Sequence, residues 1–428
     1  MKSKDKLLWN KAKKIIPGGT MLLSKNPDRY LKNYWPAYFA KAKDCTVWTI
    51  DQNKYFDLSS MSVGTNILGY SNSKINNAVI KTIKKSNISS LNSPTDVYLA
   101  KELIKMNPWA GAVRFAKSGG EALAIAIRLA RATSKKDNIA FCGYHGWHDW
   151  YLSSNLQNKK NLNKNLLTNL PIGGVPKSLK NTAFPFLINS KKSFDKAINR
   201  KNVGCVIMEV FRNIETQVSF LRYVKKICSQ KKIILIFDEC TSAFRETYGG
   251  IYKKYNINPD MVMYGKALGN GFPISAIVGR KSVMRSFDKT FISSTFWTEN
   301  TGSVAALETL KEMKKIKSWL LISKKGRYVK KNWLRIANKH NIKIKITSLD
   351  AMPKFEFDQG NNNQLKNFLC KEMLKRGFLF KDTIYISVAH KEHIIKKYLK
   401  AFDEIFGLIK IGKINKKLNS FNDFKRLN

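Results

Sequence analysis

The spacing of apolar and polar positions separates the middle of the chain from its two ends. Between residues 61 and 310, short apolar runs alternate with helical stretches, which is typical of parallel strands buried on both faces by helices. A helix with almost no breaking residue is expected over residues 121–132. The clearest predicted strands are residues 113–116, 203–208, 233–237 and 261–264. The middle of the chain is therefore predicted to be a large α/β domain with a mostly parallel sheet.

The two ends of the chain carry other patterns. The N-terminal segment begins with a basic amphipathic stretch and continues into an alternating segment, residues 45–57, that predicts a β-hairpin. In the C-terminal segment lysines dominate, and two predicted strands, residues 342–346 and 384–388, are separated by two helical stretches. That pattern is typical of a smaller α+β lobe. The predicted organisation is an N-terminal segment (1–60), a large domain (61–310) and a C-terminal small domain (311–428).

The composition is that of a folded protein with a sizeable core, because the 428 residues are 43% hydrophobic and 11% aromatic. No stretch reaches the ~18 uncharged apolar residues of a membrane span. Lysines interrupt the only apolar patch of the N-terminus, so no secretory signal is expected. The six cysteines are scattered without a Cys-x-x-Cys pair, which favours reduced thiols over a disulfide framework or a zinc site. These features predict a cytoplasmic enzyme.

The formal net charge of +47 first indicates a polyanionic partner. However, 63 of the 77 basic residues are Lys and only 14 are Arg, whereas proteins that read nucleic acids favour Arg. The lysines also spread along the whole chain. We interpret the excess mainly as charge on solvated faces, and we do not expect specific nucleic-acid binding. A polyanion-binding protein on an enzyme fold is the alternative from a different functional class.

The first candidate for chemistry is the motif Ser118-Gly119-Gly120-Glu121, between a predicted strand and a predicted helix. Backbone N–H groups at a helix start, beside a hydroxyl and bare glycines, favour binding of an anion such as phosphate. The spacing of Ser118 and Glu121 is also that of a capping box, which is a structural role. The two interpretations are compatible, and both stay open.

An acidic pair, Asp238-Glu239, ends the predicted strand at residues 233–237. Ligands of α/β folds bind at the carboxyl ends of the strands. The metal-binding acid of a nucleotide hydrolase would require a Gly-x-x-x-x-Gly-Lys-Ser/Thr loop, which the sequence lacks. Two alternatives remain: a buried carboxylate that serves a cationic ring nitrogen, and a helix cap.

Lys266 follows the predicted strand at residues 261–264 and enters a glycine-rich loop. A lysine that is partly desolvated in such a loop can form a Schiff base. In a chain with 63 lysines, a solvated surface role is the alternative.

Residues 142–150 surround two histidines with aromatic side chains. His145, His148 and Asp149 resemble metal ligands, but no further ligand cluster accompanies them. An aromatic platform against a flat ring is therefore expected, and no metal site. His390 and His393 are expected at the surface or in contacts of the small lobe.

The four motifs occur in one order along the chain: phosphate turn, aromatic–histidine loop, strand-end aspartate and loop lysine. In this order they resemble the class III aminotransferases of fold type I, enzymes that use pyridoxal phosphate (PLP), and the resemblance covers nearly the whole chain. Within that family, four segments resemble the glutamate-1-semialdehyde 2,1-aminomutase group. They are Pro17-Gly18-Gly19, residues 235–239, Tyr248-Gly249-Gly250 and Gly265-Lys266.

The resemblance implies a large PLP-binding domain and a small lobe built from both chain ends. It implies that Lys266 holds PLP as a Schiff base and later moves the proton. Asp238 would pair with the pyridine nitrogen and keep it protonated. Tyr144 would lie over the ring, with His145 beside it.

The resemblance assigns further contacts to the phosphate and to the ring oxygen. Ser118, Gly119 and Gly120 would hold the phosphate at the helix start. Thr241 lies where relatives contact the phenolic oxygen of the ring, and Asn213 is a second candidate for that contact. Thr295 matches a threonine that in relatives reaches the phosphate from the partner subunit, which implies a homodimer with shared active sites.

Three departures from the family pattern concern the substrate. Relatives often have Thr at the position of Gly120, so one phosphate hydroxyl is missing here. The Ser-Pro-Val-Arg stretch of the aminomutase is replaced by residues 20–25, and its Gly-Ser-Gly lid by the Asn-rich residues 155–169. We therefore expect a PLP-dependent aminotransferase that moves an amino group between a small-molecule amino donor and an oxo acceptor. Intramolecular transfer of the glutamate-1-semialdehyde 2,1-aminomutase type is the alternative within the family.

Overall fold

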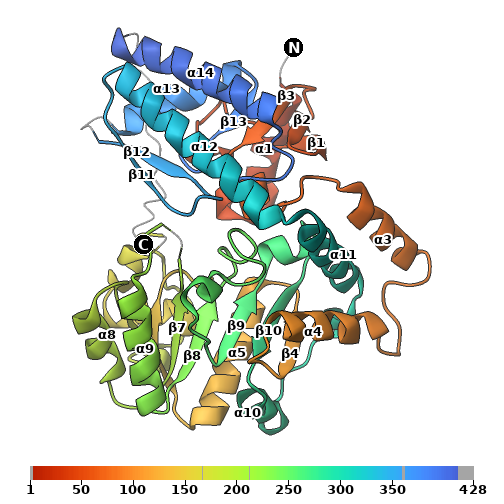
Figure 1. The fold of residues 1–428 in the computed structure, drawn as a ribbon, viewed down its shortest axis with the longest axis vertical. Coiled ribbons are helices and arrows are strands. Elements are labelled where there is room, and N and C mark those ends of the chain that lie inside the picture. Colours follow the sequence, from red (N-terminus) through yellow and green to blue (C-terminus); the bar gives the residue numbers. More distant parts are fainter. Residues whose placement is uncertain (1–2, 166, 212, 359–361, 413–428) are drawn as a thin grey trace. The chain divides into compact units, whose positions relative to one another are not determined.

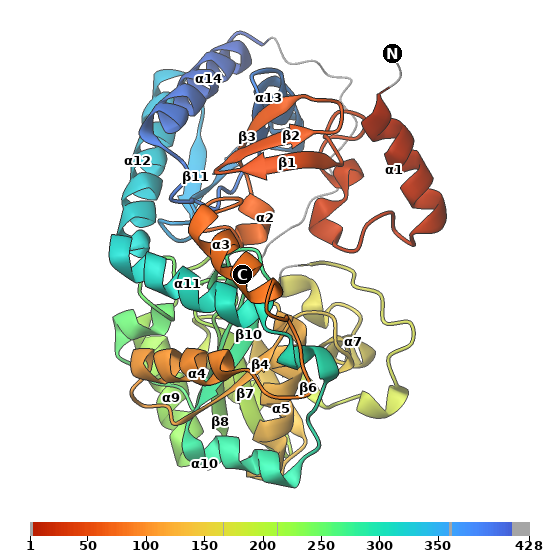
Figure 2. The same ribbon diagram turned by 90° about the vertical axis from the view of Figure 1, so that its right-hand side faces the viewer.

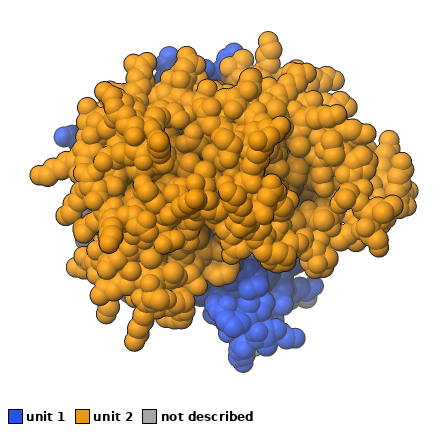
Figure 3. All heavy atoms as spheres, turned by 90° about the horizontal axis from the view of Figure 1, so that it is seen from below, with its two compact units in different colours: residues 1–72, 321–423 blue, residues 73–320, 424–428 orange. Residues whose placement is uncertain are grey.

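The computed structural model describes residues 3–165, 167–211, 213–358 and 362–412. They form two compact units, which Figure 3 shows in different colours. Unit 1 combines the chain up to residue 72 with the chain from residue 321, and unit 2 comprises residues 73–320. The boundaries between the two units thus lie after residues 72 and 320, whereas the sequence pattern predicted them at residues 60 and 310. The last part of the predicted C-terminal domain, residues 413–428, lies outside the described residues.

Unit 2 is built on a seven-stranded sheet (Figure 1). Six strands run in the same direction, and β10 is antiparallel to both of its neighbours, β4 and β9. The predicted α/β fold with a mostly parallel sheet is confirmed. The strands lie in the order β4 (Ala112–Ala116), β10 (Ser275–Gly279), β9 (Met261–Tyr264), β8 (Ile234–Asp238), β7 (Val203–Glu209), β5 (Asn138–Cys142) and β6 (Ala183–Pro185).

Helices cover both faces of this sheet, which is why its central strands are apolar without alternation. Every residue of β7, β9 and β10 is buried. Helix α5 (Gly119–Ser134) packs on one face, where its alanines allow close approach, and α8 (Lys191–Ile198) and α9 (Val218–Gln230) lie on the other (Figure 2). The other α-helices within unit 2 are α3 (Ser73–Ile83), α4 (Pro94–Met106), α6 (Asp149–Leu152), α7 (Ser154–Gln157), α10 (Lys281–Met284) and α11 (Thr301–Ile316).

Unit 1 joins the two ends of the chain in one four-stranded sheet of order β1-β2-β3-β13. The predicted hairpin is formed by β2 (Thr46–Thr49) and β3 (Lys54–Leu58), and β13 (Phe378–Phe380) from the C-terminal segment pairs in parallel with β3. The other elements are β1 (Phe39–Lys43), β11 (Ile344–Thr347), β12 (Lys354–Phe357), α1 (Lys4–Ile15), α2 (Met61–Gly64), α12 (Ser318–Lys339, which begins in unit 2), α13 (Asn362–Lys375) and α14 (Glu392–Lys410). Among the described residues, no helix is long and apolar enough to cross a membrane.

The strand predicted at residues 384–388 is wrong. The segment is buried, but its backbone N–H groups alternate between two neighbours: Ile384 and Ile386 donate to the carbonyls of Pro353 and Ala351, and Tyr385 donates to Ser59. Alternating donors build no continuous ladder with either neighbour. Two helical stretches were predicted before it, whereas among the described residues one helix, α13, lies between β12 and β13, so the prediction of two is wrong.

His390 is not at the surface. It is fully buried, and its Nε2 donates to the Asp57 carbonyl at 2.8 Å, which ties the start of α14 to β3 within unit 1. His393, three residues later, is exposed.

Candidate active site

The turn after β4 leads directly into α5. Ser118 is the N-cap residue: its hydroxyl oxygen accepts the Glu121 N–H at 3.4 Å, and the Glu121 carboxylate accepts the Ser118 N–H at 2.7 Å. The capping box is therefore present. Ser118 Oγ also lies 2.9 Å from Glu121 Oε2, so the hydroxyl hydrogen is donated to that carboxylate.

The two glycines after Ser118 leave bare backbone donors at the helix start. In the described part of the chain, neither the Gly119 N–H nor the Gly120 N–H has a hydrogen-bond acceptor. A Cβ atom on Gly119 would lie 3.1 Å from Cys240 Sγ, and one on Gly120 would lie 2.6 Å from His148 Cε1. Neither position therefore has room for a side chain, and the turn forms a cradle suited to an anion.

Asp238 ends β8 and is only 3% exposed. Its Oδ2 accepts a hydrogen bond from His145 Nδ1 at 2.8 Å, and its Oδ1 accepts the Cys240 N–H at 3.0 Å. The other imidazole nitrogen, Nε2, lies 3.1 Å from the Cys142 carbonyl oxygen. Both ring nitrogens of the buried imidazole therefore face oxygen atoms, which fixes the orientation of the ring against the Asp238 carboxyl group.

Lys266 begins a short 3₁₀ turn, Lys266–Gly269, immediately after β9. Its Nζ donates to Thr241 Oγ1 at 2.6 Å. Its backbone φ of +43° lies in the left-handed region, which costs a non-glycine residue of order 1–3 kcal/mol and is concentrated at functional sites. The structure thus aims the lysine at a buried hydroxyl that follows the neighbouring strand β8.

Strand pairing brings these groups to one edge of the sheet. Asp238 pairs with Met263 on β9 and with Glu209 on β7, so the carboxyl ends of three strands meet. Cys240 Sγ lies 3.1 Å from the Cβ positions of both Gly119 and Gly265, which places the anion cradle beside the lysine turn.

Two side chains, Glu209 and Asn165, accept hydrogen bonds from the backbone of the aromatic–histidine loop, residues 143–148. The Tyr144 N–H donates to Glu209 Oε2 at 3.0 Å, and the Gly143 N–H donates to Asn165 Oδ1 at 3.2 Å. Tyr151 meets the ring of Tyr144 edge-on at 6.0 Å. Sequence reasoning assigned no role to Glu209, although its place after a continuous apolar strand gives the same signal as Asp238.

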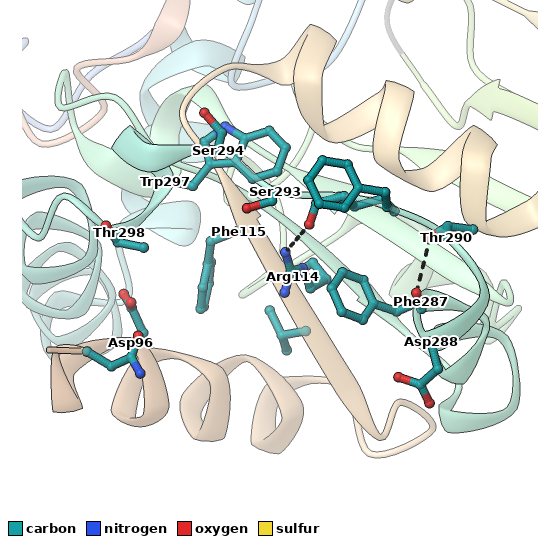
Figure 4. Close-up of a pocket in the computed structure, with 14 residues that line it drawn as sticks. Asp96, Arg114, Phe115, Phe287, Asp288, Thr290, Ser293, Ser294, Trp297 and Thr298 are labelled. Atoms are coloured by element: carbon teal, nitrogen blue, oxygen red, sulfur yellow. Dashed lines mark hydrogen bonds between the residues drawn. The ribbon is translucent and has the colours of Figure 1, made fainter. Parts of the chain in front are cut away.

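Two further predicted residues lie apart from these contacts. Asn213 is buried in the segment that follows β7. Thr295 is exposed at the start of a 3₁₀ turn, Thr295–Thr298, and Trp297 of this turn donates from Nε1 to Glu121 Oε1 at 3.1 Å. The same segment lines a cavity of about 560 Å³ together with Arg114, whose guanidinium donates to the Ile292 carbonyl (Figure 4).

Glu239, the second acid of the pair, faces inward. It is fully buried, where it accepts hydrogen bonds from the Ser242 hydroxyl and from the Tyr252 N–H. Burial raises the pKa of this carboxyl to about 7 in spite of these donors. Within the described residues, no group of three or more His, Cys, Asp or Glu side chains could hold a metal ion.

The residues present fit pyridoxal phosphate. The bare N–H groups of Gly119 and Gly120 suit a phosphate, the Asp238 carboxyl group suits a cationic ring nitrogen, and the Lys266 amine suits an aldehyde. In addition, His148 Nδ1 beside this turn is shielded from solvent and has no hydrogen-bond partner among the described residues. This atom is therefore free to contact a ligand at the turn.

The sequence is similar to those of known proteins over most of its length. The family model of the class III aminotransferases matches residues 30–405. The glutamate-1-semialdehyde 2,1-aminomutase of Methanocaldococcus jannaschii is 30% identical over 94% of this chain and 98% of its own. The 3-aminobutyryl-CoA aminotransferase of Cloacimonas acidaminovorans is also 30% identical, over 94% of this chain and 96% of its own.

The solved structures support the fold. The FumI protein of Sphingopyxis sp. MTA144, in its PLP internal aldimine form, superposes with a TM-score of 0.87 at 23% identity, over 97% of this chain and 98% of that one. An omega-transaminase from Sphaerobacter thermophilus superposes with a TM-score of 0.85 at 20% identity, over 95% of this chain and 98% of that one. Fold and family match together favour an enzyme over a polyanion-binding protein, and the chain belongs to the class III aminotransferases, which depend on pyridoxal phosphate.

Proposed function

We propose that the protein transfers an amino group between two separate molecules, a small amino donor and an oxo acceptor, with Lys266 as the residue that carries the cofactor. The observation that carries this proposal is the convergence of Lys266 and Asp238 at neighbouring strand ends. Lys266 Nζ bonds Thr241 at 2.6 Å, and Asp238 is fixed by His145 at 2.8 Å. Lys266 is thus directed at a buried hydroxyl beside the strand that carries Asp238.

When bound, PLP supplies an aldehyde carbon and a ring that accepts electrons. Asp238 would pair with the ring nitrogen, and its bonds with His145 and the Cys240 N–H hold its carboxyl group in place. Lys266 Nζ would hold the aldehyde carbon and would serve as the base that moves the proton of the amino donor. Thr241 Oγ1 orients the amine for both tasks.

The other predicted residues bind and position the cofactor. The N–H groups of Gly119 and Gly120 would bind the phosphate. Ser118 caps the start of α5 and thereby positions these two N–H groups. Tyr144 would lie over the ring, and Thr241 and Asn213 would contact its phenolic oxygen. Glu209 keeps Tyr144 in position through the backbone contact at 3.0 Å.

Two segments that the aminomutase has are replaced by other sequences in this chain, and this favours transfer between separate molecules. Residues 20–25 stand where the aminomutase has Ser-Pro-Val-Arg, and the Asn-rich residues 155–169 stand where it has its lid. One relative with 30% identity is named an aminomutase, and another is named a 3-aminobutyryl-CoA aminotransferase, so both modes occur at this distance. Intramolecular transfer on glutamate 1-semialdehyde is the second candidate.

A half-reaction screen tests the proposal. Purified protein is loaded with PLP, single amines are added, and the visible absorption band is followed. The proposal expects the band to bleach with a donor and to return only when a second molecule, an oxo acceptor, is supplied. Efficient conversion of glutamate 1-semialdehyde to 5-aminolevulinate without release of the diamine would instead establish the aminomutase.

We also propose a homodimer that shares its active sites through the segment around Thr295. This segment projects apolar side chains into solvent: Phe291 is 83% exposed and Phe296 is 69% exposed. Large exposed aromatic side chains on both sides of a predicted contact residue are typical of an interface. Unit 2 then acts as the PLP-binding domain and unit 1 as the small domain. The six unpaired cysteine thiols suit the reducing cytoplasm.

A further inference from the structure

Gly120 and His148 are packed against each other at the start of α5. A Cβ atom built on Gly120 would lie 2.6 Å from His148 Cε1 and 2.9 Å from His148 Nδ1. The imidazole therefore occupies the space that a side chain at position 120 would need. Gly146, with a φ of +103°, also lies beside Gly120, because its Cβ position is 3.7 Å from the Gly120 Cα, an ordinary van der Waals distance.

The imidazole of His148 lies against the ring of Trp147. The two rings are tilted by 31°, with centroids 4.6 Å apart. The His148 carbonyl accepts the N–H groups of Tyr151 and Leu152 at 2.9 and 3.1 Å, which anchors the backbone. A side chain held in this way is already oriented for a ligand and loses little entropy on binding.

The Nδ1 atom of His148 lacks a partner. It is shielded from solvent, and no atom of the described residues bonds to it. A buried polar atom without a partner is costly, so a ligand atom at this position is favoured. Burial lowers the pKa of His148 more than Glu121 and Asp149 raise it. In either protonation state the ring has an N–H that can be donated to a ligand oxygen.

The phosphate cradle is short of side-chain donors. The hydroxyl hydrogen of Ser118 is donated to Glu121 Oε2, and glycine at position 120 supplies no hydroxyl. The backbone N–H groups of Gly119 and Gly120 are the remaining donors of the turn. A phosphate with three terminal oxygens accepts more hydrogen bonds than these two.

We propose that His148 is a further cofactor-binding residue, whose Nδ1–H donates to the PLP phosphate in the place of a hydroxyl at position 120. The proposal rests on the assignment of this turn as the phosphate site. It explains why Gly120 and His148 occur together: the imidazole needs the space, and the phosphate needs the donor.

The test compares the affinities of the protein for PLP and for pyridoxal, which lacks the phosphate. The apo-protein is titrated with each compound, and binding is measured by absorbance and by equilibrium dialysis. His148→Phe, which keeps a ring but has no N–H, and His148→Ala should each weaken PLP binding about 10- to 100-fold. Neither variant should change pyridoxal binding. His393→Ala, at an exposed histidine of unit 1, is the matched control and should change neither.

A rescue variant removes the remaining ambiguity. Gly120→Thr alone should weaken PLP binding, because its side chain meets the imidazole at 2.6 Å. The double variant Gly120→Thr/His148→Ala should recover most of the affinity, since the new hydroxyl fills the vacated space. In the ³¹P NMR spectrum of bound PLP, His148→Phe should shift the phosphate resonance.

The proposal is overturned if both His148 variants bind PLP as wild type does, or if they lose PLP and pyridoxal equally. Either result would leave the role of Lys266 intact, because that role is measured separately by covalent attachment of the cofactor. Conversely, a wild-type protein that binds no PLP would refute the proposed function itself. If one His148 variant does not fold, as judged by circular dichroism, the other carries the comparison.

Discussion

His145 Nδ1 donates to Asp238 Oδ2 at 2.8 Å while His145 Nε2 faces the Cys142 carbonyl oxygen at 3.1 Å. An imidazole held at both nitrogens has a fixed orientation, so it can hold the neighbouring carboxyl group in place. The pair lies at the carboxyl end of β8. If Asp238 serves the ring nitrogen of PLP as proposed, His145 is the residue that positions it.

Asp238→Asn should lower the turnover number by about 10²- to 10⁴-fold, because the amide keeps the size of the side chain but not its charge. The fold and the retention of PLP should persist. Steady-state kinetics and the visible spectrum check this, with Asp195→Asn on α8 as the matched control. Full activity of Asp238→Asn would show that this carboxylate does not serve the ring.

The pairing of His145 with Asp238 predicts that the effects of the two mutations are not additive. Since His145 acts through Asp238, the variant Asp238→Asn/His145→Asn should lose less activity than the sum of the single losses, with a coupling energy of about 0.5–3 kcal/mol. A double-mutant cycle on kcat measures this energy. Additive losses would mean that the two residues act independently.

Glu239 should make the protein less stable as the pH rises. Its pKa of about 7 in the folded protein exceeds the ordinary value of 4.5, so the unfolded chain loses its proton first. The contribution to stability is full below pH 4.5 and is lost between pH 4.5 and about 7, by roughly 3 kcal/mol. Glu239→Gln removes this dependence.

Urea denaturation of wild type and Glu239→Gln at a series of pH values measures the difference. The stability of the Gln variant relative to wild type should increase across the window from pH 4.5 to 7. Parallel curves through that window would show that Glu239 ionises as easily in the folded protein as in the unfolded chain.

Glu209→Ala should loosen the aromatic–histidine loop. The Tyr144 N–H would lose its acceptor, which costs about 1–3 kcal/mol in the free energy of unfolding and weakens PLP retention. Thermal unfolding and PLP titration check the two effects. Glu215→Ala, at an exposed carboxylate soon after β7, is the control. If Glu209→Ala binds PLP as tightly as wild type does, Glu209 does not support the cofactor site.

Subunit mixing tests the shared active site. Lys266→Ala should be inactive, and Thr295→Ala should retain PLP poorly, so both are assayed at a PLP concentration too low to saturate Thr295→Ala. If Thr295 acts across the dimer, a mixed dimer has one site with both lesions and one intact site, and activity returns. If Thr295 acts within its own chain, every site keeps one lesion and mixing restores nothing.

The sequence predicts well those features that depend on local pattern. The apolar strands, the capping box of Ser118 and Glu121, and the positions of Asp238 and Lys266 at strand ends all follow from runs of neighbouring residues. Their chemical roles rest on the family resemblance and stay predictions. The strand at residues 384–388 was mistaken because an alternating apolar segment can divide its backbone hydrogen bonds between two neighbours.

Contacts between distant segments were beyond the reach of sequence reasoning. Glycine at position 120 suggested a missing phosphate donor, whereas the imidazole of His148, 28 positions later, fills that space in the structure. Likewise, the bond between Glu209 and the Tyr144 N–H depends on the pairing of β5 with β7. Both contacts require the tertiary fold, because no local pattern joins the residues concerned.

Reduction with borohydride tests the central claim most directly, namely that Lys266 carries the cofactor. The PLP-loaded protein is reduced, digested and analysed by mass spectrometry. The account predicts that the cofactor mass is fixed on the peptide that contains Lys266, and that Lys266→Ala shows no fixed cofactor and no turnover. Attachment at any other lysine, or turnover by Lys266→Ala, would contradict it.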